Sequence, residues 1–191
     1  LCGVEGGLSD AVTNVGSIMN FTMVPYGNAQ RNPRTGEITC QHGPDECTLN
    51  KAQNCAIYYG ETVDVWWPFV LCTEDLTTGG VDSIARCADE NPGLDTDTIN
   101  TCYQGPEGDA LLAQAGVVTD NLDPPHTGTP WIVLQGEPLA DTSDITASVC
   151  EAYTGSPKPA ACDAVVSSKP RVPQGQCYKQ KSALAYAFPE A

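Results

Sequence analysis

Basic residues are scarce in this chain of 191 residues: nine Lys and Arg stand against 24 Asp and Glu, for a formal net charge of −15. Binding to phosphates needs clustered Lys and Arg, so this composition excludes nucleic acid as a partner. Long apolar runs are also missing, since no stretch approaches the roughly 20 residues of a membrane-spanning helix. We therefore expect no insertion into a membrane, and a length that suits one domain with an embellishment.

Histidine is scarce as well, and His42 and His126 are the only two. The short C-x-x-C and H-x-x-x-H pairs of zinc sites are absent, so the ten cysteines indicate no metal, and nothing indicates a cofactor. Ten cysteines are too many for a reducing compartment, which disfavours the alternative of scattered free thiols in a cytosolic protein. We expect a disulfide framework outside the cytosol, with these structural candidates: Cys40, Cys47, Cys55, Cys72, Cys87, Cys102, Cys150, Cys162 and Cys177.

Asn20-Phe21-Thr22 is a sequon for N-glycosylation. Together with the cysteines it indicates passage through the secretory pathway, with Asn20 as the glycosylation site.

Apolar periodicity predicts a mixture of helices and short strands. We expect helices at 8–19, 46–59, 80–88, 96–103, 107–119 and from 141–144 to about 153, with a further apolar segment at 63–72. We expect strands at 21–26, 131–134 and 138–139, the last two joined by a turn at 135–137, and a loop at 27–43. Beyond Gly155 the chain is rich in Pro, Ser and Lys, and we expect a mostly extended tail pinned by Cys162 and Cys177.

Residues 40–55 carry three cysteines, a histidine, a glutamate and an asparagine at fixed offsets. This string resembles the diagnostic motif of the GILT family of interferon-inducible lysosomal thiol reductases, C-Q-H-G-x-x-E-C-x-x-N-x-x-x-x-C, with every specified position filled. Residues 24–29 are similar to the family's V-P-Y-G-N-A segment, and residues 124–126 and 129–131 are similar to its P-P-H and x-P-W segments.

The resemblance implies an α/β, thioredoxin-like fold. It places a single domain at 1–155, with a disulfide-rich helical insertion at about 45–122, and an extended Pro-rich tail at 156–191. It also implies that Pro130 follows a cis peptide bond and faces the active site. The first strand of that fold has no counterpart in these residues, so we expect the sequence to be incomplete at its N-terminus or another chain to contribute the strand.

Leu1-Cys2-Gly3-Val4-Glu5 resembles the family's L-C-P-x-C active site, which implies Cys2 as the catalytic nucleophile. Glu5 stands where the family has the resolving cysteine, so an external thiol would have to complete each turnover. A carboxylate near the sulfur also opposes formation of the thiolate. The alternative for Cys2 is a plain disulfide partner.

Within the motif we interpret the cysteines as staples between loop and helix, the alternative being catalysis. We interpret His42 as a residue hydrogen-bonded in a tight loop, the alternative being a group that tunes a nearby thiol. Glu46 suits the first turn of a helix, where it favours the helix dipole. We expect Trp66 and Trp67 to pack in the core, the alternative being an exposed partner patch. Nine cysteines outside the active site cannot all pair among themselves, so one must be free, pair with Cys2 or bridge to another chain, and Cys177 is the natural candidate for such a bridge.

Two hypotheses follow. The first is a GILT-like thiol–disulfide oxidoreductase that reduces protein disulfides with small thiols, weakly or as a monothiol enzyme, in a lysosomal, vacuolar or extracellular setting. The second is a non-catalytic GILT-like glycoprotein that serves with partner chains as a structural or assembly subunit.

Overall fold

A computed structural model describes residues 7–165 and 184–186. In chain order the helices are α1 (Ser9–Val15), α2 (Pro44–Gly60), α3 (Val63–Thr73), α4 (Ile84–Asp89), α5 (Thr96–Gln104), α6 (Pro106–Asp120), α7 (Ile145–Ala152) and α8 (Ala160–Val165), with 3-10 turns η2 (Gly16–Ile18) and η3 (Val81–Ser83). The strands are β1 (Thr22–Val24), β2 (Gln30–Arg31), β3 (Ile38–Thr39), β4 (Trp131–Leu134), β5 (Glu137–Pro138) and β6 (Leu184–Tyr186).

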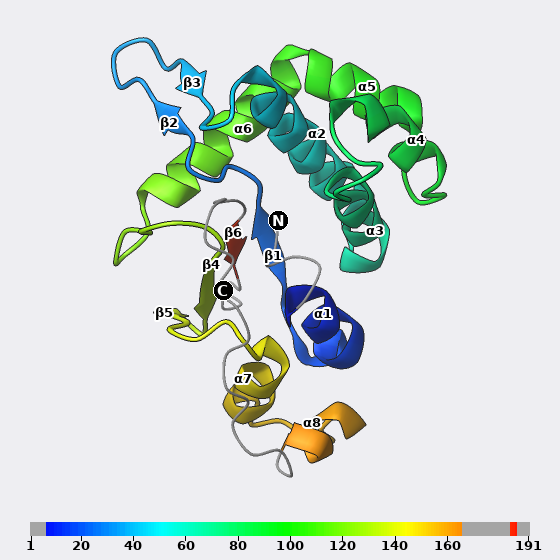
Figure 1. The fold of residues 1–191 in the computed structure, drawn as a ribbon, viewed down its shortest axis with the longest axis vertical. Coiled ribbons are helices and arrows are strands. Elements are labelled where there is room, and N and C mark those ends of the chain that lie inside the picture. Colours follow the sequence, from blue (N-terminus) through cyan, green and yellow to red (C-terminus); the bar gives the residue numbers. More distant parts are fainter. Residues whose placement is uncertain (1–6, 166–183, 187–191) are drawn as a thin grey trace.

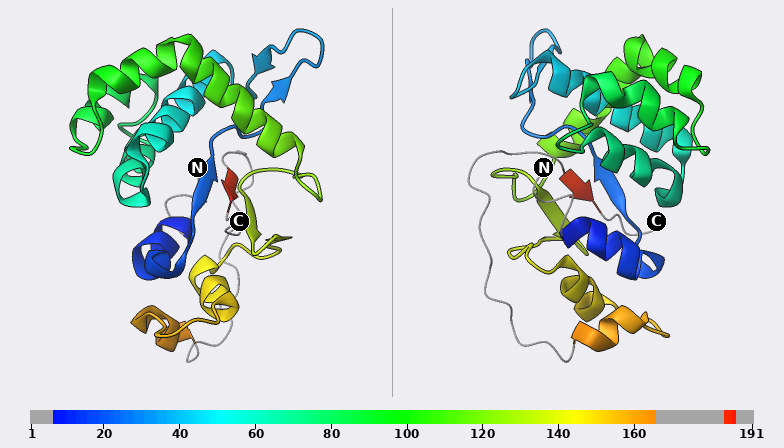
Figure 2. Two further views of the ribbon diagram at one scale, coloured as in Figure 1. Left: turned by 180° about the vertical axis from the view of Figure 1, so that it is seen from behind. Right: turned by 45° about the vertical axis from the view of Figure 1, so that its right-hand side comes forward.

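The helices form two groups on either side of a small sheet (Figure 1). Helices α2 to α6 lie together at one end, and α1, α7 and α8 lie at the other. Both views of Figure 2 keep this division, with the β2–β3 hairpin projecting beside the first group. The structure thus shows a helical unit between β1 and β4 in the chain, where the sequence predicts a helical insertion.

The sheet has the strand order β1-β6-β4-β5. Strand β6 pairs antiparallel with β1 and parallel with β4, and β4 pairs antiparallel with β5. Gln135 and Gly136 turn the β4–β5 hairpin with φ of 53° and 89°, the left-handed values of a tight hairpin turn. The expected turn at 135–137 is therefore confirmed.

The C-terminal segment differs from expectation. We predicted mostly extended chain beyond Gly155, but the described residues of that segment include helix α8 and strand β6. Strand β6 takes the place between β1 and β4. The sequence predicted no strand at these residues.

Most predicted elements between 44 and 152 are confirmed. Helix α2 begins at Pro44, which has no N–H to leave unpaired in the first turn, and Asp45 and Glu46 complement the positive end of the helix. Helix α5 is capped by Asp95, whose side chain accepts a hydrogen bond from the Thr98 backbone N–H. None of the described helices is long and apolar enough to cross a membrane.

The larger core cluster joins α1, α7 and the helical unit around two tryptophans. Trp66 and Trp67 are 3% and 5% exposed, and Phe21 packs on both rings with centroid distances of 5.4 and 5.6 Å. These tryptophans therefore belong to the core and form no exposed patch. A smaller cluster around Tyr26 and Leu112 fills the space between β1, β4 and α6.

Four disulfides cross-link the described residues: Cys40–Cys47, Cys55–Cys102, Cys72–Cys87 and Cys150–Cys162. They account for eight of the ten cysteines in the sequence. Cys2 and Cys177, on which the catalytic and intermolecular hypotheses rest, lie outside the described residues.

Candidate functional site

The turn that follows β1 is held by helix α2. The Asn54 side chain donates a hydrogen bond to the Pro25 carbonyl at 2.7 Å, and the Asn50 side chain donates one to the Tyr26 carbonyl at 3.3 Å. Buried carbonyls need such partners, because an unpaired polar group away from water is costly. The asparagine of the 40–55 motif therefore holds the 24–29 segment in place.

Tyr26 anchors the same turn by packing its buried ring against helix α6. It is 1% exposed, and its ring lies so close to Gly116 of α6 that a Cβ there would meet two ring atoms at 2.9 Å. Among the described residues its hydroxyl has no hydrogen-bond partner. Burial, helped by the Asp120 carboxylate and opposed by Arg31, raises the pKa of Tyr26 above 10.0. The phenol therefore stays neutral at physiological pH and serves as a packing group.

Glu46 holds the loop that carries His42. Its Oε2 accepts a hydrogen bond from the His42 backbone N–H at 2.6 Å and lies 3.0 Å from His42 Nδ1. Gly27 of the β1 turn lies against the other carboxylate oxygen, with 3.1 Å between Oε1 and the position a Cβ would take. His42 is thus tied into a tight loop at the start of α2, as we interpreted it from the sequence.

Two disulfides tie the motif to its surroundings. Cys40–Cys47 joins the end of the β2–β3 hairpin to the first turns of α2, and Cys55–Cys102 joins α2 to α5. All three cysteines of the motif are therefore structural staples.

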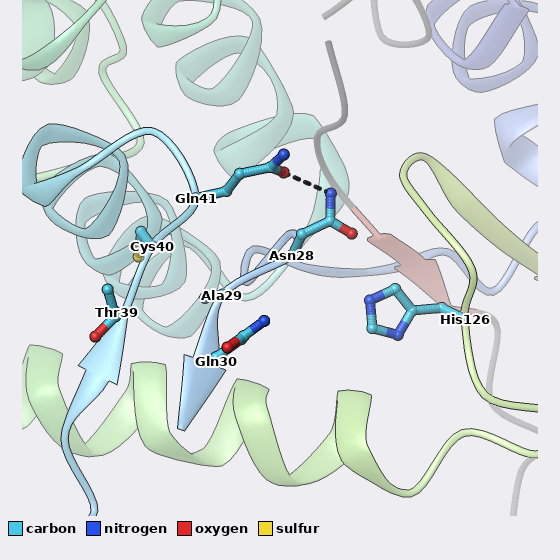
Figure 3. A pocket seen from close by; sticks show the side chains of 7 residues that line it. All are labelled: Asn28, Ala29, Gln30, Thr39, Cys40, Gln41 and His126. Carbon is cyan, nitrogen blue, oxygen red and sulfur yellow. Dashed lines mark hydrogen bonds between the residues drawn. The ribbon is translucent and has the colours of Figure 1, made fainter. Parts of the chain in front are cut away.

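A pocket of about 530 Å³ opens where the three family-like segments meet. It is lined by Asn28, Ala29, Gln30, Thr39, Cys40, Gln41 and His126 (Figure 3). The Asn28 side chain donates to Gln41 Oε1 at 2.8 Å and to Thr129 Oγ1 at 3.4 Å. In Figure 3 His126 approaches the same space from the loop opposite Asn28 and Gln30. Asn28 therefore links the β1 turn, the motif loop and the segment before β4.

Pro130 stands at the start of β4, directly after the residue that Asn28 contacts. The Thr129–Pro130 peptide bond is cis, which is the geometry that the resemblance implies, and Pro130 itself is exposed. The structure thus brings Pro130 close to the pocket, whereas Cys2 lies outside the described residues.

The β2–β3 hairpin, with Gln30 and Thr39, was not predicted from the sequence. We expected a loop at 27–43, because two-residue strands are too short to show alternation. The available signal was Asn32-Pro33-Arg34-Thr35-Gly36, in which the Asn32 carboxamide oxygen accepts from the Arg34 and Thr35 N–H groups and Gly36 has a φ of 77°.

Metal ligands do not gather in the part of the chain that the structure describes, where no three His, Cys, Asp or Glu side chains could hold an ion together. The pocket offers one imidazole and otherwise neutral amide and hydroxyl groups. Its chemistry is that of hydrogen bonding.

Comparison with known proteins agrees with the motif. The family model for gamma interferon inducible lysosomal thiol reductase (GILT) matches residues 4–91. A gamma-interferon-inducible lysosomal thiol reductase of Mus musculus is 34% identical over 165 residues, covering 85% of this chain and 64% of the mouse protein. A gamma-interferon-responsive lysosomal thiol protein of Arabidopsis thaliana is 33% identical over 161 residues, covering 81% of this chain and 66% of the plant protein.

GILT-like protein 1 of Drosophila melanogaster is 30% identical over 181 residues, covering 84% of this chain and 68% of the fly protein. The chain thus spans slightly less than two thirds of the mouse and plant relatives and slightly more than two thirds of the fly relative. The matches to these relatives extend over most of the chain, and so the chain belongs to the GILT family.

Proposed function

We propose that this chain is a thiol–disulfide oxidoreductase that reduces protein disulfides, with Cys2 as the nucleophile. Family membership carries the proposal. It is supported by the hydrogen bonds from Asn28 to Gln41 and Thr129, which join the three family-like segments beside Pro130. In this proposal Pro130 faces the substrate. The fold is thioredoxin-like, with α1, β1, β4, β5 and α7 as its core and the helical unit inserted at about 45–122. The domain spans 1–155, and the C-terminal segment 156–191 adds strand β6 to its sheet and helix α8 beside α7.

An external thiol has to resolve the mixed disulfide, because Glu5 stands where the family has the resolving cysteine. The Cys2 thiolate attacks one sulfur of the substrate disulfide, which forms a mixed disulfide and releases the other substrate sulfur as a thiolate. One external thiol attacks the Cys2 sulfur and releases the second substrate thiol. A second external thiol then frees Cys2, and the two external sulfurs leave as a disulfide.

The setting we propose is a lysosomal, vacuolar or extracellular one. The four disulfides fit an oxidising compartment. The mouse and Arabidopsis relatives are lysosomal by name. Asn20 is exposed in the segment before β1, and we propose it as the glycosylation site.

The second candidate is a non-catalytic structural or assembly subunit, which Glu5 and the two glycines after it favour. Glycines at the start of a helix weaken it, and a weak helix start stabilises a thiolate less.

One assay separates the two. Reduction of a model protein disulfide is followed at mildly acidic and neutral pH with excess small thiol, for the wild type, Cys2→Ser and Glu5→Cys. For a reductase, Cys2→Ser abolishes the enzyme-dependent rate. Glu5→Cys restores a C-x-x-C pair and makes the rate less dependent on the concentration of external thiol, since the new cysteine resolves the mixed disulfide.

Equal rates with and without Cys2 would contradict the reductase. So would a peptide map of the native protein in which Cys2 is linked to Cys177.

A further inference from the structure

We propose that the pocket lined by Asn28, Gln30, Thr39, Gln41 and His126 is a subsite for the main chain of an extended, unfolded polypeptide. The proposal deepens the proposed function and rests on it in one respect: the bound segment would flank the disulfide to be reduced. The binding itself follows from the chemistry of the pocket wall.

The wall is neutral in a strongly acidic protein. Three carboxamides, one hydroxyl and one imidazole line the pocket, and none of the lining residues carries a carboxylate, an ammonium or a guanidinium group. A carboxamide presents a donor and an acceptor together, which matches the N–H and C=O groups of a peptide unit. Neutral groups also accept peptides irrespective of the charges on their side chains, as a site for many sequences requires.

The composition of the wall disfavours other ligands. Phosphate and nucleotide sites use Arg, Lys or helix N-termini, and no basic side chain lines this pocket. The planar rings of nucleobases commonly stack on aromatic side chains, and no Phe, Tyr or Trp lines this pocket.

The hydrogen-bonding groups are available and partly fixed. Asn28 is oriented by its bonds to Gln41 and Thr129. No described residue bonds to the side chains of Gln30, Thr39 or His126, so these groups are open to a ligand. The volume of about 530 Å³ lies within the roughly 300–1,000 Å³ of typical ligand pockets. It admits a short peptide segment and excludes a folded domain.

The adjoining hairpin provides a strand edge. Within the described residues β2 and β3 pair only with each other, with Gln30 opposite Thr39, so each strand keeps one unpaired edge. Extended peptides bind such edges through main-chain hydrogen bonds. Gln30 and Thr39 also line the pocket. A peptide paired with the free edge of β2 or of β3 would therefore lie next to the side-chain donors and acceptors of the pocket.

The test measures binding without any disulfide chemistry. The protein is Cys2→Ser, and the probe is a fluorescein-labelled unfolded polypeptide whose cysteines carry carbamidomethyl groups. Gln30→Ala should weaken binding by about fivefold, the effect of one neutral hydrogen bond. Gln104→Ala on α5, an exposed carboxamide away from the pocket, is the matched control and should leave the Kd unchanged.

A second probe examines the main chain directly. N-methylation of two consecutive amides in the probe removes their N–H donors and should weaken binding to the protein with an intact Gln30. Equal binding of both probes would overturn the proposal, as would equal loss in Gln30→Ala and Gln104→Ala. Displacement of the peptide by a neutral glucose oligomer at lower concentration than by unlabelled peptide would assign the pocket to glycans and overturn it as well.

Reduction assays separate this proposal from the reductase itself. With Cys2 present, Gln30→Ala should lower kcat/KM for a protein disulfide relative to that for a small disulfide by about the same fivefold factor. Peptide binding without any reduction would contradict the reductase alone, and reduction without pocket-dependent peptide binding would contradict the subsite alone.

Discussion

The two disulfides of the GILT motif should contribute very unequally to stability. Cys55–Cys102 spans a sequence separation of 47 residues and Cys40–Cys47 one of 7. A cross-link restricts the unfolded chain more when the loop it closes is longer. The chain-entropy relation then gives about 4 kcal/mol for the long loop and about 2.4 kcal/mol for the short one at 25 °C. Burial adds to the difference, since Cys55 and Cys102 are 0% and 1% exposed.

The comparison uses two double variants, Cys55→Ala with Cys102→Ala and Cys40→Ala with Cys47→Ala, so that neither leaves an unpaired thiol. Urea unfolding in the absence of reductant gives the free energy of unfolding of each. We expect the first variant to lose at least about 1.5 kcal/mol more than the second. A loss in the first that is no larger than in the second would refute the entropic reasoning.

Two further predictions concern packing and charge. Burial raises the pKa of Glu74 above 4.5, against the opposing hydrogen bond from Gln53, so its contribution to stability is full below 4.5 and is lost as pH rises through the raised pKa. The variant Glu74→Gln keeps an oxygen that accepts the hydrogen bond from Gln53. It should raise the unfolding free energy at pH 7 and should reduce the change in that free energy between pH 7 and 4.5. An unchanged pH dependence would contradict this assignment. Gly116→Ala should destabilise by about 1–3 kcal/mol because the new methyl group meets the buried Tyr26 ring. Gly16→Ala, with no neighbour closer than 4.0 Å, should not, and equal thermal unfolding of both variants would argue against the Tyr26 contact.

Local patterns were enough to predict most helices, although the starts expected at 46 and 107 lie one or two residues inside α2 and α6. Pro44 and Pro106 begin α2 and α6 at the positions where their missing N–H groups cost nothing. The core role that we expected for Trp66 and Trp67 is confirmed by their burial. These features depend on residues close together in the chain, and a single sequence carries that information.

The pairing of distant segments could not be predicted in the same way. Strand β6 lies between β1 and β4 although about 160 residues separate Val24 from its partner Leu184, and no local pattern reports such a partner. The disulfide connectivity had the same difficulty, because many pairings satisfy the same cysteine positions. The pocket likewise depends on contacts between distant segments, since Asn28, Gln41 and His126 meet only after the chain has folded.

The placement of the disulfides bears on how the molecule can change shape. Cys55–Cys102 and Cys72–Cys87 lie within the helical unit. Cys40–Cys47 joins the end of the β2–β3 hairpin to α2, the first helix of that unit, and Cys150–Cys162 joins α7 to α8. Between the helical unit and the sheet, the described contacts are the two connecting chain segments, apolar packing and hydrogen bonds such as those from Asn50 and Asn54. No disulfide among the described residues crosses this seam. The pocket opens beside it, so packing and hydrogen bonds, rather than a covalent cross-link between described residues, set the shape that a bound chain meets there.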